Sequence, residues 1–74
     1  MARLTRFQVE NAVSLLNSAV FVSGKQVEYH ITEREGGGYT IFRACHGECE
    51  TLLHGDLREC YIYVLGVKEG VLNA

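Results

Sequence analysis

The chain has 74 residues, of which 47% are hydrophobic and 22% are charged, and this composition excludes intrinsic disorder and a low-complexity tail. A chain of this length hides only about 60% of the surface that its unfolded form exposes, which leaves little material for a deep catalytic cleft. Seven basic residues against nine acidic ones give a net charge of −2. This balance argues against nucleic acid as the partner, because phosphate binding needs a basic surface. We expect one domain over residues 1–74.

The first expected element is a helix over about residues 6–21. Thr5 and Gln8 have the spacing of a capping box at its start. Apolar residues then recur at three- and four-residue spacing as far as Val20, while asparagine, serine and glutamate take the opposite face. The dipeptide Ser23-Gly24 marks the end of the helix.

Three strands are expected next, over about residues 26–34, 39–45 and 48–53. The first shows alternation of period two, and the others are short runs of strand-forming residues. The glycines at 36–38 provide the first turn, and His46-Gly47 provides the second. These signals predict a three-stranded antiparallel meander. On one side of its third strand we expect Cys49, Thr51 and Leu53.

A second helix is expected over about residues 57–69. Asp56 and Glu59 repeat the capping pattern before an apolar stripe of helical spacing. The run 61–65 is also rich in strand formers, so a fourth strand is the alternative. With the helix, the fold class is α+β: a two-layer sandwich in the order helix, three-stranded antiparallel meander, helix, with one sheet face open.

Both the open sheet face and the second helix have more apolar residues than one small core needs. Besides His30 and Thr32, the open face carries one of two sets, either Tyr39, Ile41 and Arg43 or Thr40, Phe42 and Ala44. Both sets contain large apolar groups, which indicates a partner or a second copy over that face. Tyr61 and Tyr63 lie about 200° apart on a helical wheel, so one of them should face outward. Scattered surface apolar residues are the alternative explanation.

Cysteine usage and the lack of targeting signals indicate a soluble cytoplasmic protein without membrane contact. An odd number of cysteines, three, favours a reducing compartment over a secreted domain held by disulfides. The N-terminal residues do not read as a signal peptide, and the longest apolar run is far below the roughly 18 residues of a membrane span.

Four residues approach the spacing of a zinc knuckle, namely Cys45, Cys49, His54 and Cys60. Cys60 belongs to an apolar stripe, where a thiol behaves as a small hydrophobic group. Reduced, mostly buried cysteines and no metal or other cofactor are therefore expected. Cys45 and His46 should not form a nucleophile and base, because neighbours on an extended strand point to opposite faces. No catalytic group can be assembled, so we expect no enzyme.

Five glutamates gather in the hairpin region: Glu28, Glu33, Glu35, Glu48 and Glu50. One interpretation is a solvated strand face that discourages edge pairing. The other is an acidic patch that meets a basic protein surface or mimics nucleic acid.

The expected order of elements is a helix, three strands and a second helix, and it covers nearly the whole chain. This order is similar to that of the double-stranded-RNA-binding domain. In that family a lysine-rich segment opens the second helix and grips phosphates. Here the corresponding residues 55–59 hold one basic and two acidic side chains. This departure argues against RNA binding by that mode.

A second resemblance is to small phage and prophage proteins. It is carried by the short amphipathic first helix, by Gly37-Gly38-Tyr39 at the start of a strand, and by the tyrosine-rich segment from Leu57 to Gly66. The resemblance implies an accessory protein that blocks a host defence or regulatory complex by binding it, as anti-CRISPR proteins do.

The sequence therefore predicts a non-enzymatic module that binds a protein partner, with a homodimer as its expected state. Tyrosines favour interface hot spots and glutamates steer basic partners. The expected partner-binding residues are Tyr39, Tyr63, Glu33, Glu35, Glu48 and Glu50. The alternative is a nucleic-acid-binding domain whose open sheet provides a stacking platform of Tyr39, Phe42 and Arg43.

Overall fold

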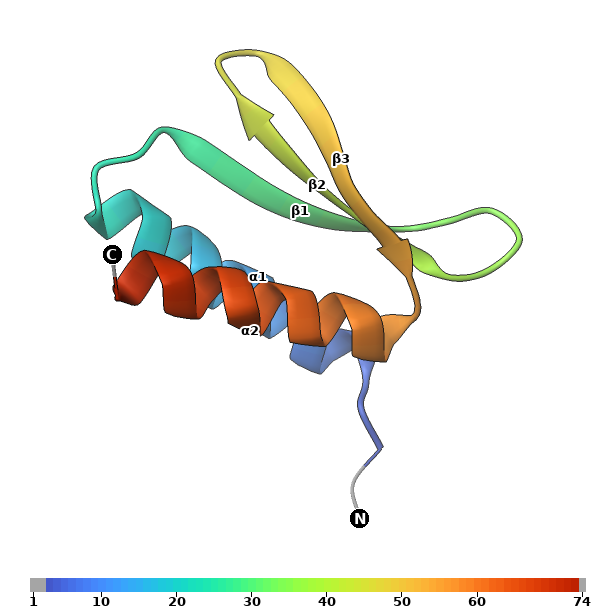
Figure 1. The fold of residues 1–74 in the computed structure, drawn as a ribbon. Helices are drawn as coiled ribbons and strands as arrows, with labels where there is room; N and C mark the ends of the chain where they lie inside the picture. Colours follow the sequence, from blue (N-terminus) through green and yellow to red (C-terminus); the bar gives the residue numbers. More distant parts are fainter. Residues whose placement is uncertain (1–2, 74) are drawn as a thin grey trace.

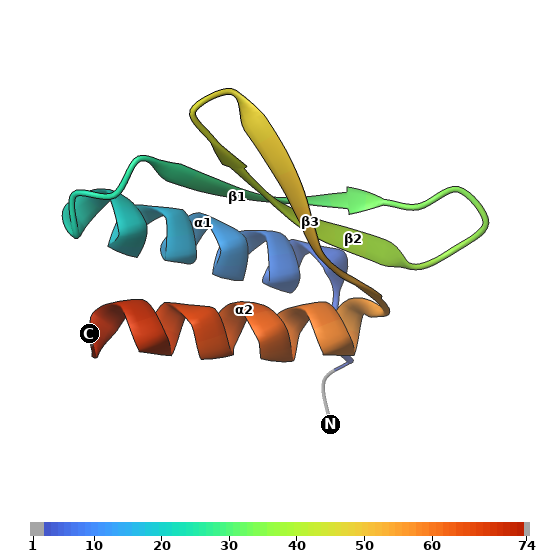
Figure 2. The same cartoon turned by 45° about the horizontal axis from the view of Figure 1, so that its top comes forward.

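The computed structural model describes residues 3–73, which form two helices and three strands (Figure 1). In chain order these are α1 (Arg6–Val22), β1 (Val27–Glu33), β2 (Tyr39–Cys45), β3 (Glu48–Gly55) and α2 (Leu57–Leu72). The strands pair antiparallel in the order β1-β2-β3. Both helices lie side by side on one face of the sheet (Figure 2). The expected α+β fold with the order α-β-β-β-α is confirmed.

Each helix begins at the capping box that the sequence indicates. At α1 the Thr5 hydroxyl accepts a hydrogen bond from the Gln8 amide at 3.3 Å, and the Gln8 side chain accepts one from the Thr5 amide at 2.8 Å. At α2 the carboxylate of Asp56 accepts from the Glu59 amide at 2.8 Å, and the reciprocal bond is 3.1 Å long. These bonds satisfy amides that have no partner within the helix.

The core lies between the helix pair and the sheet, and α1 supplies most of it. The buried residues of this core are Val9, Ala12, Val13, Leu16, Val20, Tyr29, Ile41, Cys60 and Val64. Ile41 is 0% exposed, so the set Tyr39, Ile41 and Arg43 faces the helices. The other set, with Phe42 at its centre, therefore lies on the open face.

The run 61–65 is helical, so the fourth-strand alternative is wrong. Tyr61 and Tyr63 are both half-buried against the core, and it is Ile62, 60% exposed, that faces outward. The expectation of one outward tyrosine is therefore wrong. The reason is that α2 packs against α1, β2 and β3 together, so its buried arc is wide enough to include a ring on either side of Cys60.

A bulge in β3 changes which of its residues share a face. Ile41 pairs with Leu53 and Phe42 pairs with Thr51, which leaves Leu52 as an extra residue. Thr51 therefore lies on the open face with Phe42, whereas Leu53 faces the core with Ile41. Cys49 pairs with Ala44 and also lies on the open face. The expectation that Cys49, Thr51 and Leu53 share one side is wrong, because the bulge interrupts the alternation.

The outer edge of β1 is occupied by a side chain of α1. The Asn17 amide accepts a hydrogen bond from the Tyr29 backbone N–H at 2.7 Å and donates one to the Tyr29 carbonyl at 2.9 Å. Both backbone groups of Tyr29 therefore point away from β2 and are satisfied by α1. We call this contact the Asn17 clamp.

Loss of the Asn17 clamp should destabilise the fold. In Asn17→Ala the two backbone groups of Tyr29 lose their partners, and we expect the free energy of unfolding to fall by about 1–3 kcal/mol. Urea unfolding followed by circular dichroism measures this. Asn11→Ala is the matched control, because Asn11 is exposed on the same helix. Equal stability of the two variants would contradict the role of the clamp.

Candidate functional site

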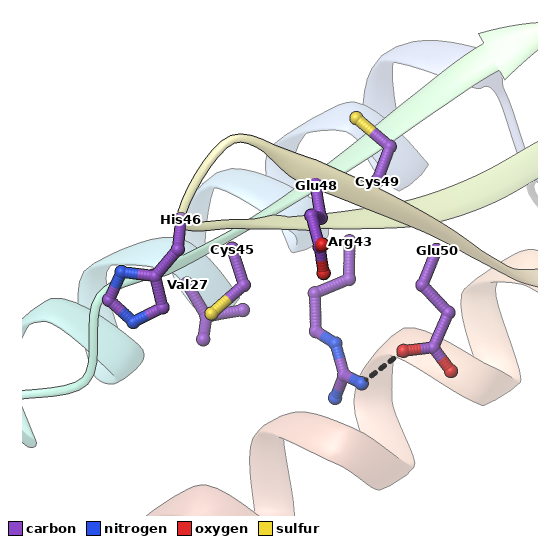
Figure 3. Close-up of a pocket in the computed structure, with 7 residues that line it drawn as sticks. All are labelled: Val27, Arg43, Cys45, His46, Glu48, Cys49 and Glu50. Atoms are coloured by element: carbon purple, nitrogen blue, oxygen red, sulfur yellow. Dashed lines mark hydrogen bonds and ion pairs between the residues drawn. The ribbon is translucent and has the colours of Figure 1, made fainter.

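The β2–β3 hairpin rises away from the helix layer toward its tip (Figures 1 and 2). A hollow of about 390 Å³ lies at this end of the hairpin (Figure 3). Its lining consists of Val27, Arg43, Cys45, His46, Glu48, Cys49 and Glu50. We call it the hairpin hollow, and it combines one guanidinium, two carboxylates, an imidazole and two thiols.

An ion pair crosses the hairpin hollow. Arg43 and Glu50 are opposite each other on β2 and β3, and the guanidinium donates a hydrogen bond to the carboxylate (Figure 3). This bond, with a smaller contribution from Tyr29, raises the pKa of Arg43 above its ordinary value, so the guanidinium stays charged. Beside it, Val27 and Cys45 are cross-strand neighbours that form a less polar patch.

The expected acidic region is divided between the two ends of the sheet, and its fifth glutamate, Glu28, lies on β1 opposite Ala44. Glu33 and Glu35 lie at the β1–β2 turn, whereas Glu48 and Glu50 lie next to the β2–β3 turn. Successive turns of a meander are at opposite ends of the sheet, which for strands of this length is about 20 Å. Glu33 also lies within 4.0 Å of the Arg6 guanidinium. Only the pair at the β2–β3 end lines the hairpin hollow.

The two expected tyrosines are not free surface anchors. Tyr39 is half-buried against the core, and the Arg6 guanidinium lies 5.9 Å from its ring centroid. Tyr63 is also half-buried against the core. Of the six expected binding residues, the structure therefore brings Glu48 and Glu50 together at the hollow and leaves the other four elsewhere.

The expected stacking platform for nucleic acid is split between the two faces of the sheet. Phe42 lies on the open face and stacks on His30 with ring centroids 5.1 Å apart. Tyr39 and Arg43 lie on the face that carries Ile41, because strand side chains alternate. The three side chains cannot stack with one strand of bases.

Cys45 and His46 lie on the same side of the hairpin, and the expectation of opposite faces is wrong (Figure 3). His46 has a φ of 52°, in the left-handed region, so the chain is no longer extended there. Both side chains therefore line the hollow. Sequence reasoning missed this because a positive φ at a residue other than glycine is uncommon.

The four residues of the zinc-like spacing are distributed over the fold. Cys45 and Cys49 both line the hollow, Cys45 from the inner face of the sheet and Cys49 from the open face, whereas Cys60 is buried in the core. His54 shares a hydrogen bond of 2.9 Å with the Thr40 hydroxyl on the open face. Within residues 3–73 no three histidine, cysteine or acidic side chains are grouped as metal ligands.

Comparison of the chain with protein-family models, with curated proteins and with solved structures found no match. In the part of the chain that the structure describes, neither helix has the length and apolar composition needed to cross a membrane.

The three thiols should react in the order of their exposure. Cys49 is exposed and Cys45 is half-buried, whereas Cys60 is buried. Burial, with smaller contributions from Asp56 and Glu59, raises the pKa of the Cys60 thiol. Because the thiolate is the reactive form, we expect iodoacetamide to modify Cys49 first, Cys45 more slowly, and Cys60 only on unfolding.

Mass spectrometry of peptides from a time course of labelling measures this order. Cys49→Ser is the control, because it should remove the fastest phase and leave the others unchanged. Modification of Cys60 in the folded protein at the rate of Cys49 would contradict the described core.

Proposed function

We propose that the protein is a small non-enzymatic binding module that holds an extended segment of a protein partner along the free edge of β3. The observation that carries this proposal is the difference between the two sheet edges. The β1 edge is occupied by the Asn17 clamp. Residues Glu48 to Thr51 of β3 are all exposed.

The direction of the backbone groups follows from the clamp. Tyr29 points its N–H and C=O away from β2, so Tyr29 and its partner Arg43 do not bond to each other in the ladder. Arg43 therefore bonds to Glu50 on its other side. By the same alternation Cys49 and Thr51 direct their backbone groups away from the sheet, where an added strand can pair with them.

The bulge at Leu52 limits the length of the pairing. A bulge disrupts the regular spacing of edge groups, and an added strand is not expected to continue past it. The segment that pairs with β3 is therefore short, about four residues, and its register is set by Cys49 and Thr51.

The hairpin hollow next to this edge favours a basic side chain. The Arg43 guanidinium neutralises Glu50, and Glu48 adds a second, exposed carboxylate. The apolar atoms of Val27 and Cys45 can contact the aliphatic stem of a lysine or arginine. Electrostatic attraction of this kind speeds association and weakens as salt is added.

A binding module without catalytic activity affects its partner by covering part of the partner's surface. This fits the accessory or inhibitor role on a host defence or regulatory complex that the phage-type resemblance implies. The free state of all three cysteines is in keeping with a reducing cytoplasm.

Proline at position 51 should weaken binding strongly. The test uses peptides selected from a phage-displayed library of random decapeptides, and we expect lysine- or arginine-containing sequences. Thr51→Pro removes the outward amide together with the threonine side chain, a change that edge strands tolerate, and should weaken binding at least tenfold. Thr51→Val is the control, because it keeps the amide. Equal binding to both variants, or no selected peptide, would contradict the proposal.

Neutralising the exposed carboxylate should weaken binding of the same peptides and make it less sensitive to salt. We expect Glu48→Gln to lower affinity severalfold at low ionic strength, because one attractive charge is lost. Glu35→Gln, at the opposite end of the sheet, is the matched control. Binding of a single-stranded oligonucleotide that Thr51→Pro leaves unchanged would instead support the nucleic-acid alternative.

A further inference from the structure

The side of α1 that is turned away from the core is exposed and uncharged. We call it the α1 face, and it consists of Phe7, Asn11, Ser14, Leu15, Ser18, Phe21 and Val22. Phe7 is 76% exposed, Phe21 is 82% exposed and Val22 is 85% exposed. Large apolar groups this exposed add little to the core of the chain that carries them.

The charges of α1 lie at the border of this face, where Glu10 adjoins Phe7 and Ser14 by helical spacing. Arg6 and Glu10 are the charged residues of the helix, and they pair with each other at 3.2 Å. Arg6 also reaches toward Glu33 at the end of β1. A solvent-facing helix side normally carries charges, whereas the centre of a protein interface is depleted of them and rich in aromatic residues. The α1 face has the composition of an interface.

The arrangement of residues on the α1 face matches a two-fold axis. Phe7, Ser14 and Phe21 are spaced seven apart, so they form one stripe along the helix with a drift of about 20° at each step. Ser14 is the midpoint. A two-fold axis that lies between the two helices beside Ser14, perpendicular to both, places Phe7 of each copy against Phe21 of the other. The small side chains of Ser14 and Ser18 let the two helices approach closely.

Antiparallel pairing also keeps like charges apart. In a parallel pair, Arg6 would face the partner's Arg6. In the antiparallel pair, Arg6 and Glu10 face the uncharged end of the partner helix near its Val22 and Ser18, and the helix dipoles are opposed favourably. With a net charge of −2 on each chain, an uncharged face is where two copies meet with little repulsion.

We propose that the α1 face binds a second copy of this chain, with the two α1 helices antiparallel about Ser14. This inference goes beyond the proposed function, because it uses the opposite layer of the molecule. The two phenylalanines bury roughly 300 Å² per protomer, less than the roughly 800 Å² of a standard interface. The dimer is therefore expected to be a weak one, with a dissociation constant in the micromolar range. Both β3 edges remain free in it, which makes the dimer bivalent.

The first test is the molar mass by light scattering or sedimentation equilibrium over a range of micromolar concentrations, with a reductant present. The wild-type chain should shift from monomer to dimer as concentration rises. Ser14→Glu places two negative charges against each other at the axis, and should weaken the dimer at least tenfold. Gln26→Glu is the matched control, because it adds the same charge at an exposed position outside the α1 face.

The second test identifies the orientation. F7K and F21E should each weaken the dimer, since each removes an aromatic group from both contacts. The double variant F7K/F21E should recover it, because the antiparallel pair brings opposite charges together twice. A parallel pair would bring like charges together, and recovery would fail.

A wild-type chain that stays monomeric at these concentrations would overturn the proposal, as would a dimer that Ser14→Glu leaves intact. Failure of the double variant to recover the dimer would overturn the antiparallel arrangement. Circular dichroism of each variant checks that the fold is retained. Peptide binding at β3 is measured separately, so either proposal can fail while the other stands.

Discussion

The amide of Asn17 satisfies both backbone groups of Tyr29, and the remaining arrangement of the sheet depends on this contact. It holds α1 along β1, so that the apolar stripe of the helix covers the inner face of the sheet. It also occupies the middle of one sheet edge. Because backbone groups alternate in direction along paired strands, the outward direction of the Tyr29 groups and the register of the three strands together imply that Cys49 and Thr51 point outward on β3. The register of the strands thus links the edge that α1 occupies to the edge that remains free.

A small two-layer fold has more surfaces than it can cover. The core uses the inner half of α1, one stripe of α2 and the inner side of the sheet. The outer face of α1, the open side of the sheet and the β3 edge then remain. Each has a different chemistry: apolar and uncharged on the helix, a His30–Phe42 stack on the sheet, and backbone groups beside carboxylates on β3. Different surfaces suit different partners, so self-association and partner binding can occur together.

Local sequence patterns predicted the helices and strands well, because a helix cap or the alternation of a strand depends on only a few neighbouring residues. The long-range features were not predictable in that way. The bulge at Leu52 depends on how β3 registers against β2, the reversed side chain of His46 depends on a left-handed turn, and the role of Asn17 depends on a contact twelve residues away. Glu33 and Glu35 are separated from Glu48 and Glu50 because successive turns of a meander lie at opposite ends of the sheet. Of the expected site, Glu48 and Glu50 lie together because they are on the same strand.

Amide hydrogen exchange of the isolated protein, resolved residue by residue by NMR at concentrations where it is monomeric, tests the difference between the two edges most directly. The Tyr29 amide should be protected although it lies on an edge strand, because Asn17 is its acceptor. The amides of Cys49 and Thr51 should exchange rapidly. Rapid exchange at Tyr29 together with protection at Cys49 and Thr51 would contradict this assignment of the two edges, since β1 would then be the open one.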